Sequence, residues 1–365
     1  MIYLDHGATS FHKPICVRRA VMRAMEQCAN PGRGGHKAAM AAAEQVYRCR
    51  EVAGEMFGCQ PEQVVFTSNC THGLNIAIRT LVRPGERVLI TGFEHNAVTR
   101  PLYALGADLL IAGRKLFCWD EMLYSWEKCL KKGPKAAIFT HVSNVFGYIL
   151  PISEMASLCH QYGVPFVVDG AQSAGMLPIS LQQLGAAFVA MPGHKGLLGP
   201  QGTGMLLCGQ NPLPLICGGT GSESQNQSMP DHVPDRAEAG TLNVPGIAGL
   251  EAGMRYVNQI GMEIIFRREC TQARLCAAAL ERGGFRVFAG EHQSGTLSVL
   301  PRGDCQDVAQ SLSRQGIAVR AGLHCAPLAH ESAGTLQTGT VRICFGHDAN
   351  SAQTKAFLQR ILRMS

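Results

Sequence analysis

Two segments of the sequence place reactive side chains where a strand is expected to end. In residues 167–172 a carboxylate, Asp169, follows an apolar run, and open α/β sheets bind ligands at the carboxyl ends of strands. In residues 191–196, Lys195 stands between His194 and a glycine. A lysine amine whose pKa is lowered by its surroundings forms a Schiff base with an aldehyde or ketone. Taken singly, Asp169 has the simpler interpretation of a turn or N-cap residue, and Lys195 that of a surface lysine.

A third segment, residues 320–328, carries a candidate nucleophile, Cys325. The thiolate is the nucleophilic form of cysteine, and it needs cationic or dipolar neighbours to ionise near neutral pH. We expect Arg320 and His324 to supply that positive potential. The chain has 15 cysteines, so the competing interpretation is a buried structural residue. The cysteines show neither C-x-x-C nor C-x-x-H spacing, which argues against a zinc site and a small disulfide scaffold.

The elements that position these segments follow from the alternation of two patterns. Between residues 14 and 208, short β-branched apolar runs alternate with amphipathic stretches. This alternation is typical of a mainly parallel sheet covered by helices on both faces. The expected strands are residues 64–67, 87–90, 107–111, 136–140, 165–168, 187–191 and 204–207. The expected helices are residues 70–81, 97–105, 121–131 and 152–162.

A second unit follows a long irregular segment. Residues 217–244 are rich in Gly, Ser, Asn, Gln and Pro, and a loop of that length is either disordered or functional. Two helical stretches over residues 245–280 come next. The later strands are expected at residues 285–288, 295–300, 317–320 and 340–345, and the later helices at 305–315 and 351–364. We predict two domains, residues 14–245 and 246–365, with residues 1–13 packing against the smaller second one.

Composition limits the range of functions. The 365 residues are 46% apolar and 16% charged, which is enough apolar material for a sizeable core. The formal net charge is +6, but no segment concentrates it, so we expect no nucleic-acid partner. No apolar run approaches the roughly 20 residues of a membrane span, and the N-terminus has no signal-peptide pattern. We expect a cytoplasmic protein without a membrane partner, whose thiols are mostly reduced.

Taken together, the Asp169 and Lys195 segments resemble the class V aminotransferase family of fold-type I enzymes, which use pyridoxal 5′-phosphate (PLP). Further segments match the family's motifs in the same order: residues 3–10, 30–36, 68–75, 94–97 and 143–147. The resemblance implies an α/β fold, with a mainly parallel seven-stranded sheet in a large PLP-binding domain and a smaller α+β C-terminal domain.

The resemblance also implies roles around the cofactor. Lys195 would carry PLP as a Schiff base and later move the Cα proton of the substrate. Asp169 would keep the ring nitrogen protonated, and Gln172 would bond the phenolic oxygen. His95 would stack on the ring and shuttle protons, unless it is a structural histidine. His194 would add a donor beside the lysine.

The phosphate end of the cofactor is implied in the same way. Thr71 and His72 open an expected helix, where a hydroxyl and backbone N–H groups suit a phosphate. Thr241, in residues 240–243, would reach the phosphate held by a second copy of the chain, which implies a homodimer. Its plainer interpretation is the N-cap of the helix that follows.

Some residues depart from the family's usual pattern. Pro192 stands where relatives often have a hydroxyl residue that touches the phosphate, and Cys70 stands where threonine is common. The phosphate site is therefore expected to be weaker or to rely on other groups. His6 replaces an asparagine, and residues 345–350 also differ from the usual continuation.

The Cys325 segment resembles the active-site cysteine segment of cysteine desulfurases, and its short link to Arg342 resembles their short-loop group. The resemblance implies that Arg342, Asn144 and Arg320 bind the carboxylate of L-cysteine. An arginine that starts a strand is otherwise usually solvated or ion-paired. The implied reaction converts L-cysteine to L-alanine and leaves a persulfide on Cys325 for a sulfur-acceptor protein.

Three alternatives to this reaction remain at the level of sequence. The first is selenocysteine lyase, and the second is another class V aminotransferase or C–S lyase. The third, of a different class, is a non-catalytic scaffold that has kept the fold of the PLP enzymes.

Overall fold

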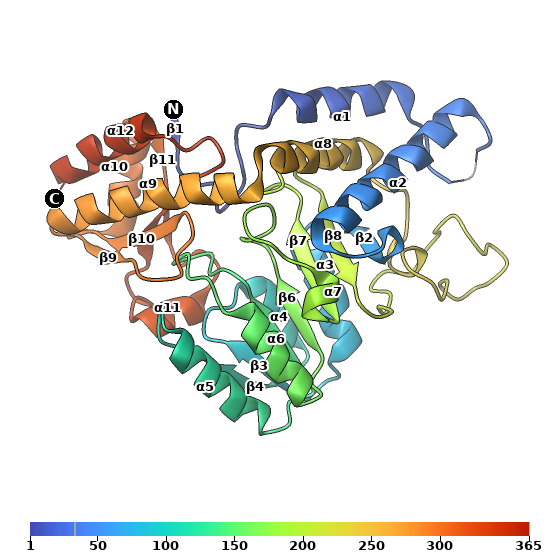
Figure 1. Ribbon diagram of the computed structural model, residues 1–365, viewed down its shortest axis with the longest axis horizontal. Helices are drawn as coiled ribbons and strands as arrows, with labels where there is room; N and C mark the ends of the chain where they lie inside the picture. Colours follow the sequence, from blue (N-terminus) through green and yellow to red (C-terminus); the bar gives the residue numbers. More distant parts are fainter. Residues whose placement is uncertain (33, 365) are drawn as a thin grey trace.

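The larger of two main sheets has seven strands and holds the Asp169 and Lys195 segments (Figure 1). The computed structural model describes residues 1–32 and 34–364, so Arg33 of the 30–36 motif and Ser365 lie outside the described residues. The strand order of this large sheet is β2-β8-β7-β6-β5-β3-β4. The neighbours from β7 to β4 are parallel, whereas β8 is antiparallel to both of its neighbours. The mainly parallel seven-stranded sheet is thus confirmed. Its strands are β2 (Val64–Thr67), β3 (Arg87–Thr91), β4 (Asp108–Ala112), β5 (Ala136–Thr140), β6 (Phe166–Asp169), β7 (Phe188–Pro192) and β8 (Gly204–Cys208).

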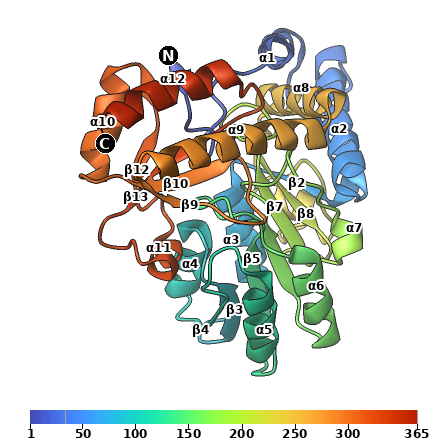
Figure 2. The same cartoon turned by 60° about the vertical axis from the view of Figure 1, so that its left-hand side comes forward.

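A smaller antiparallel sheet is built from the C-terminal third of the chain. Its strand order is β12-β13-β10-β9, formed by β9 (Arg286–Phe288), β10 (Thr296–Leu300), β12 (Arg320–Gly322) and β13 (Thr340–Cys344). Figure 2 shows α10 (Cys305–Arg314) and α12 (Ser351–Ile361) beside this sheet, with the long α9 (Met262–Arg282) running from it toward the large sheet. A short strand at the N-terminus, β1 (Ile2–Tyr3), pairs in parallel with β11 (Ile317–Ala318).

The structure differs from the expected elements in three places. The run expected as one strand at residues 317–320 is split into β11 and β12, because the first half pairs with β1 and the second with β13. A seven-residue helix, α11 (Pro327–Ala333), lies between the strands expected at residues 317–320 and 340–345, where no helix was predicted. Two helices were not delimited from the sequence: α1 (Ile15–Gln27) and α2 (Lys37–Phe57), which pack with α8 (Val244–Ile260).

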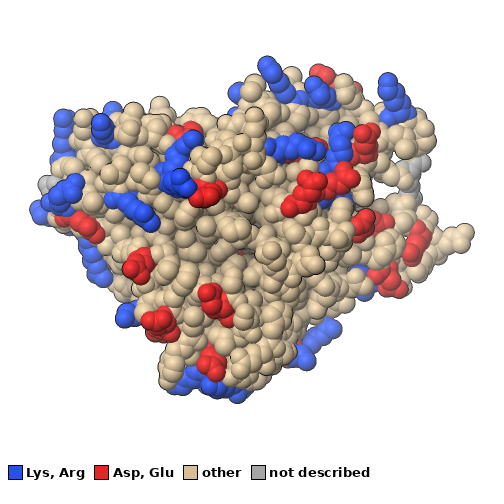
Figure 3. Space-filling view, in the orientation of Figure 1, with Lys and Arg blue, Asp and Glu red and all other residues tan. Residues whose placement is uncertain are grey.

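The surface mixes both signs of charge. On the face shown in Figure 3, lysine and arginine side chains are interspersed with aspartate and glutamate side chains. Within the part of the chain that the structure describes, no helix is both long and apolar enough to cross a membrane.

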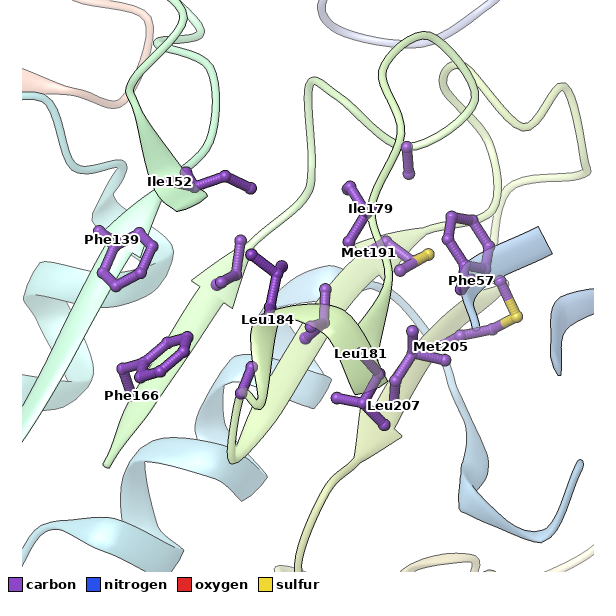
Figure 4. Close-up of a cluster of buried hydrophobic side chains, with 14 of the residues drawn as sticks. Phe57, Phe139, Ile152, Phe166, Ile179, Leu181, Leu184, Met191, Met205 and Leu207 are labelled. Atoms are coloured by element: carbon purple, nitrogen blue, oxygen red, sulfur yellow. The ribbon is translucent and has the colours of Figure 1, made fainter. Parts of the chain in front are cut away.

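The core explains why the strands of the large sheet are apolar on both sides. In β3, Val88 and Ile90 pack toward one face and Leu89 toward the other, since successive strand side chains point in opposite directions. The first face is covered by α3 (Cys70–Leu81) and α4 (Asn96–Ala104). The second is covered by α2, α8, α5 (Trp119–Leu130), α6 (Ile152–Gln161) and α7 (Leu181–Leu184). Figure 4 shows part of this second layer, where Phe139 and Phe166 of neighbouring strands pack near Ile152 and Leu184. With both faces covered, the carboxyl edge is the part of the sheet left to form a site.

Candidate active site

A cavity opens at the carboxyl edge of the large sheet, where three parallel strands end side by side. Thr140, Asp169 and Pro192 are the last residues of β5, β6 and β7, and all three line the cavity. Most of the residues expected to bind the cofactor or the substrate line it too: Thr71, His95, Asn144, Asp169, Gln172, His194 and Lys195. The other expected residues lie outside its lining: His72, Thr241, Arg320, Cys325 and Arg342.

Lys195 lies on the loop between β7 and β8, and the N-terminal segment fixes that loop. The backbone carbonyl of His194 accepts hydrogen bonds from Ser10 Oγ at 2.9 Å and from Lys13 Nζ at 2.8 Å. Lys195 lies deep in the protein, with part of its surface facing the cavity. Burial, and then the positive charge of Arg342, lowers the pKa of Lys195. More of the amine is therefore in the neutral form that attacks a carbonyl carbon.

Asp169 is the buried carboxylate of the cavity. Its Oδ1 accepts hydrogen bonds from the backbone N–H of Ala171 at 2.9 Å and from Cys70 Sγ at 3.4 Å. Burial raises the pKa of Asp169, although these two donors and the charge of Lys195 oppose the rise. A cationic ring nitrogen at this position would stabilise the ionised carboxylate. The bond to Ala171 also shows that Asp169 stabilises its own turn, as the simpler interpretation of this residue expects.

His95 has a structural role as well as a place in the cavity. Its Nδ1 caps α4 by accepting a hydrogen bond from the backbone N–H of Ala97 at 3.0 Å. In the neutral ring the proton must therefore be on Nε2. Burial, helped by the charges of Lys195 and Arg342, lowers the pKa of His95 to about 4. His95 is thus a neutral imidazole with one N–H group left to donate.

The N-terminus of α3 lies at another wall of the cavity. Asn69 caps this 12-residue helix through its side chain, which accepts from the N–H of His72 at 2.9 Å. The side chain of Thr71 is exposed and lines the cavity. His72 points elsewhere, since its Nδ1 accepts from the backbone N–H of Ser68 at 3.3 Å. The hydroxyl of Thr71 and the helix N-terminus remain as the groups that suit a phosphate.

These residues fit PLP. The cavity combines an amine of lowered pKa, a buried carboxylate, a neutral imidazole and the N-terminus of a helix. Lys195 would hold the aldehyde carbon, Asp169 the ring nitrogen and α3 the phosphate. Among the described residues, no group of three or more His, Cys, Asp and Glu side chains is arranged to hold a metal ion.

Arg342 is close to this cavity but is already paired. Its side chain on β13 is 2% exposed. Its Nη2 donates to Asp5 Oδ1 at 2.7 Å, and its Nη1 donates to the backbone carbonyl of Asn144 at 2.9 Å. Its Nε has no partner, so this N–H of the guanidinium is free to donate. The ion-paired interpretation thus describes Arg342 in this structure, and Asp5 is a site residue whose role the sequence analysis missed.

Cys325 is exposed, on a turn between β12 and α11. The turn reaches the cavity through its backbone, since the carbonyl of Cys325 accepts from the N–H of Asn96 at 2.7 Å. Contrary to expectation, His324 supplies no positive charge, because burial lowers its pKa to about 2. The exposed Arg320 is charged, and its field contributes to the low pKa of His95.

Known proteins resemble this chain over nearly its whole length. Residues 2–357 match the sequence profile of the family described as Aminotransferase class-V. A protein named probable cysteine desulfurase from Methanothermobacter thermautotrophicus is 31% identical over 92% of this chain and 89% of its own length. The apo structure of a cysteine desulfurase from Thermococcus onnurineus superposes with a TM-score of 0.91, at 29% identity, over 99% of this chain and 94% of the other. The cysteine desulfurase CsdA from Escherichia coli superposes with a TM-score of 0.84, at 26% identity, over 100% and 94%. The chain therefore belongs to the class V aminotransferase family.

Proposed function

We propose that the protein is a PLP-dependent cysteine desulfurase, which converts L-cysteine to L-alanine and leaves a persulfide on Cys325. This proposal rests on one observation: Lys195 and Asp169 line the same cavity, and the carbonyl of Cys325 is hydrogen-bonded to the first residue of α4, next to His95. The cysteine desulfurases among the related proteins support the same chemistry.

The first half of the reaction belongs to the cavity. PLP, when bound, supplies a ring that withdraws electrons from Cα of the amino acid. Lys195 holds the cofactor, and its amine accepts and returns the Cα proton, for which its lowered pKa suits it. Asp169 keeps the proton on the ring nitrogen. Gln172 donates one N–H to the carbonyl of Gly7 at 3.0 Å, which leaves its other N–H for the phenolic oxygen.

The second half belongs to Cys325. Its thiolate attacks the sulfur of L-cysteine, so that the S–S bond forms while the Cβ–S bond breaks. The Cβ atom takes up a proton, and alanine leaves. One L-cysteine and one thiol give one L-alanine and one persulfide, so the reaction needs no external oxidant. The exposure of Cys325 supports onward transfer of the sulfur to an acceptor protein.

The carboxylate of L-cysteine is assigned to Arg342, Asn144 and Arg320. Arg342 retains a free Nε donor beside Asn144, and a guanidinium binds carboxylates through paired N–H groups. Arg320 is exposed on β12, which pairs with β13 so that Arg320 lies opposite Arg342. Its charge would attract the anionic end of the substrate.

The test is to incubate the PLP-loaded protein with L-cysteine and a reducing thiol, and to assay alanine and sulfide together. We expect equal amounts of both. Cys325→Ser should lose at least about 100-fold in rate, whereas Cys217→Ser, the other exposed cysteine, should be unchanged. Full activity of Cys325→Ser would contradict the proposal and favour a C–S lyase reaction that needs no protein thiol.

We also propose that the protein is a homodimer. Thr241 is exposed and lines a neighbouring cavity with Ser68 and His72, away from Lys195 of its own chain. The exposed face of α1 carries large apolar side chains that a second copy could cover: Ile15, Met22 and Met25. Sedimentation equilibrium should give twice the mass of the chain, and a monomer that retains PLP would contradict the dimer.

A cytoplasmic location is part of the same proposal. All 15 cysteines, each within the described residues, are free thiols, which fits a reducing compartment. Fractionation of cells that express the protein would test this location.

A further inference from the structure

The turn that carries Cys325 has an unusual backbone. His324 and Cys325 follow one another with φ angles of 50° and 56°, both in the left-handed region. Residues with a Cβ rarely adopt this conformation, because the Cβ approaches the neighbouring carbonyl oxygen. Two such residues in succession persist only where surrounding contacts hold them.

Two hydrogen bonds from the edge of the large sheet hold this turn. Asn144 Nδ2 donates to the backbone carbonyl of His324 at 2.7 Å. The backbone N–H of Asn96 donates to the carbonyl of Cys325, also at 2.7 Å. Asn96 is the first residue of α4, so its N–H has no partner within the helix. Each strained residue is therefore held by a donor that belongs to the cofactor cavity or lies next to it.

Asn144 connects the turn to Arg342. It is buried, lines the cavity, and accepts a hydrogen bond from Arg342 through its own carbonyl. Asn144 thus joins the carbonyl of His324 to the guanidinium of Arg342, and a carboxylate that binds Arg342 through its free Nε would compete for the Asn144 amide. A carboxylate accepts hydrogen bonds more strongly than a peptide carbonyl. The Asn144 amide therefore gains when it donates to the carboxylate instead of the His324 carbonyl.

We propose that Asn144 and the N–H of Asn96 act as a latch on Cys325. They hold its turn in the left-handed conformation until an amino-acid carboxylate takes the Asn144 amide, and the released turn then moves the thiol. Both are positioning groups. That the ligand is an amino acid rests on the proposed function. That Asn144 and Asn96 hold the turn does not.

The holding role is tested by the rate at which iodoacetamide alkylates Cys325, followed by peptide mass spectrometry. Asn96→Pro removes the N–H, and Asn96→Ala keeps it. Proline is tolerated at the first position of a helix, and the preceding His95 has φ −76° and ψ 156°, which suit a residue before proline. We expect Asn96→Pro to be alkylated about five to ten times faster than wild type, and Asn96→Ala within about twofold of it. Cys217 serves as the internal reference.

Equal rates in the two Asn96 variants, after circular dichroism has shown both to be folded, would overturn the holding role. This comparison needs no turnover, so it can succeed even if the protein releases no alanine from L-cysteine.

The release is tested in the wild type with L-alanine, and with L-alaninamide as a control that lacks the carboxylate. We expect L-alanine, and not L-alaninamide, to accelerate the alkylation of Cys325 several-fold. Asn144→Ala should be alkylated fast without any ligand. If L-alanine slows the alkylation or leaves it unchanged, carboxylate-driven release is refuted.

Discussion

The pairing of Arg342 with Asp5 allows a prediction whose size can be worked out from the structure. The guanidinium is 2% exposed and the carboxylate 19%, at a separation of 2.7 Å. Breaking a fully buried ion pair costs about 3–5 kcal/mol, because one charge is left buried and unpaired. Asp5 is partly exposed, so water screens some of that cost. We expect Asp5→Asn, which keeps the shape and one acceptor oxygen, to lower the free energy of unfolding by about 2 kcal/mol.

The assay is urea unfolding of the wild type, Asp5→Asn and Asp348→Asn. Asp348 is the matched control, since it is a nearby acid with a 33% exposed side chain that pairs only with histidines among the described residues. L-alanine should restore more stability to Asp5→Asn than to the wild type, because its carboxylate replaces the missing charge beside Arg342. Equal unfolding midpoints for the three proteins, with no difference in the response to L-alanine, would refute the assignment of Asp5 and Arg342.

Two further predictions concern buried groups. Cys70 donates to Asp169 at 3.4 Å. Cys70→Ala, which removes this donor, should lower the rate of alanine formation several-fold, whereas Cys70→Ser, which keeps a donor, should stay near wild type. Burial lowers the pKa of His330 from 6.5 to about 4. Between pH 6.5 and about pH 4 the unfolded chain therefore binds a proton at this residue that the folded chain does not bind. Folding stability is lost as the pH falls through this range. Between pH 7.5 and pH 5, the urea midpoint should fall less in His330→Gln than in His232→Gln, a control at an exposed histidine. An equal fall of the midpoint in both variants would contradict the lowered pKa of His330.

Much of the fold could be predicted because its elements have local signals. The amphipathic run over residues 70–81 predicts α3 at its observed bounds, and the structure shows that Asn69 caps its start. The strand β5 was likewise predicted at its bounds, because it is an apolar run buried along its length. The split of β11 from β12 had no local signal, because it depends on pairing with β1 from the other end of the chain.

The candidate site shows the same division. Asp169 and Lys195 were found because each stands at the end of a recognisable strand, beside glycines. Asp5 was missed because its partner, Arg342, is 337 residues away in the sequence. The neutrality of His324 could not be predicted either, since it depends on burial against Thr340 of β13, which is distant in the sequence. Helix α11 is short, and it depends on the burial of Ala329 and His330 rather than on helix propensity.

We propose that Lys195, on the loop between β7 and β8, is the residue that carries the cofactor. The direct measurement is to reduce the PLP-loaded protein with borohydride, digest it, and locate the pyridoxyl group by mass spectrometry. We predict the added mass on Lys195, with none on the partly buried Lys13 nearby. A label on another lysine, or no label on a protein that binds PLP, would contradict the account.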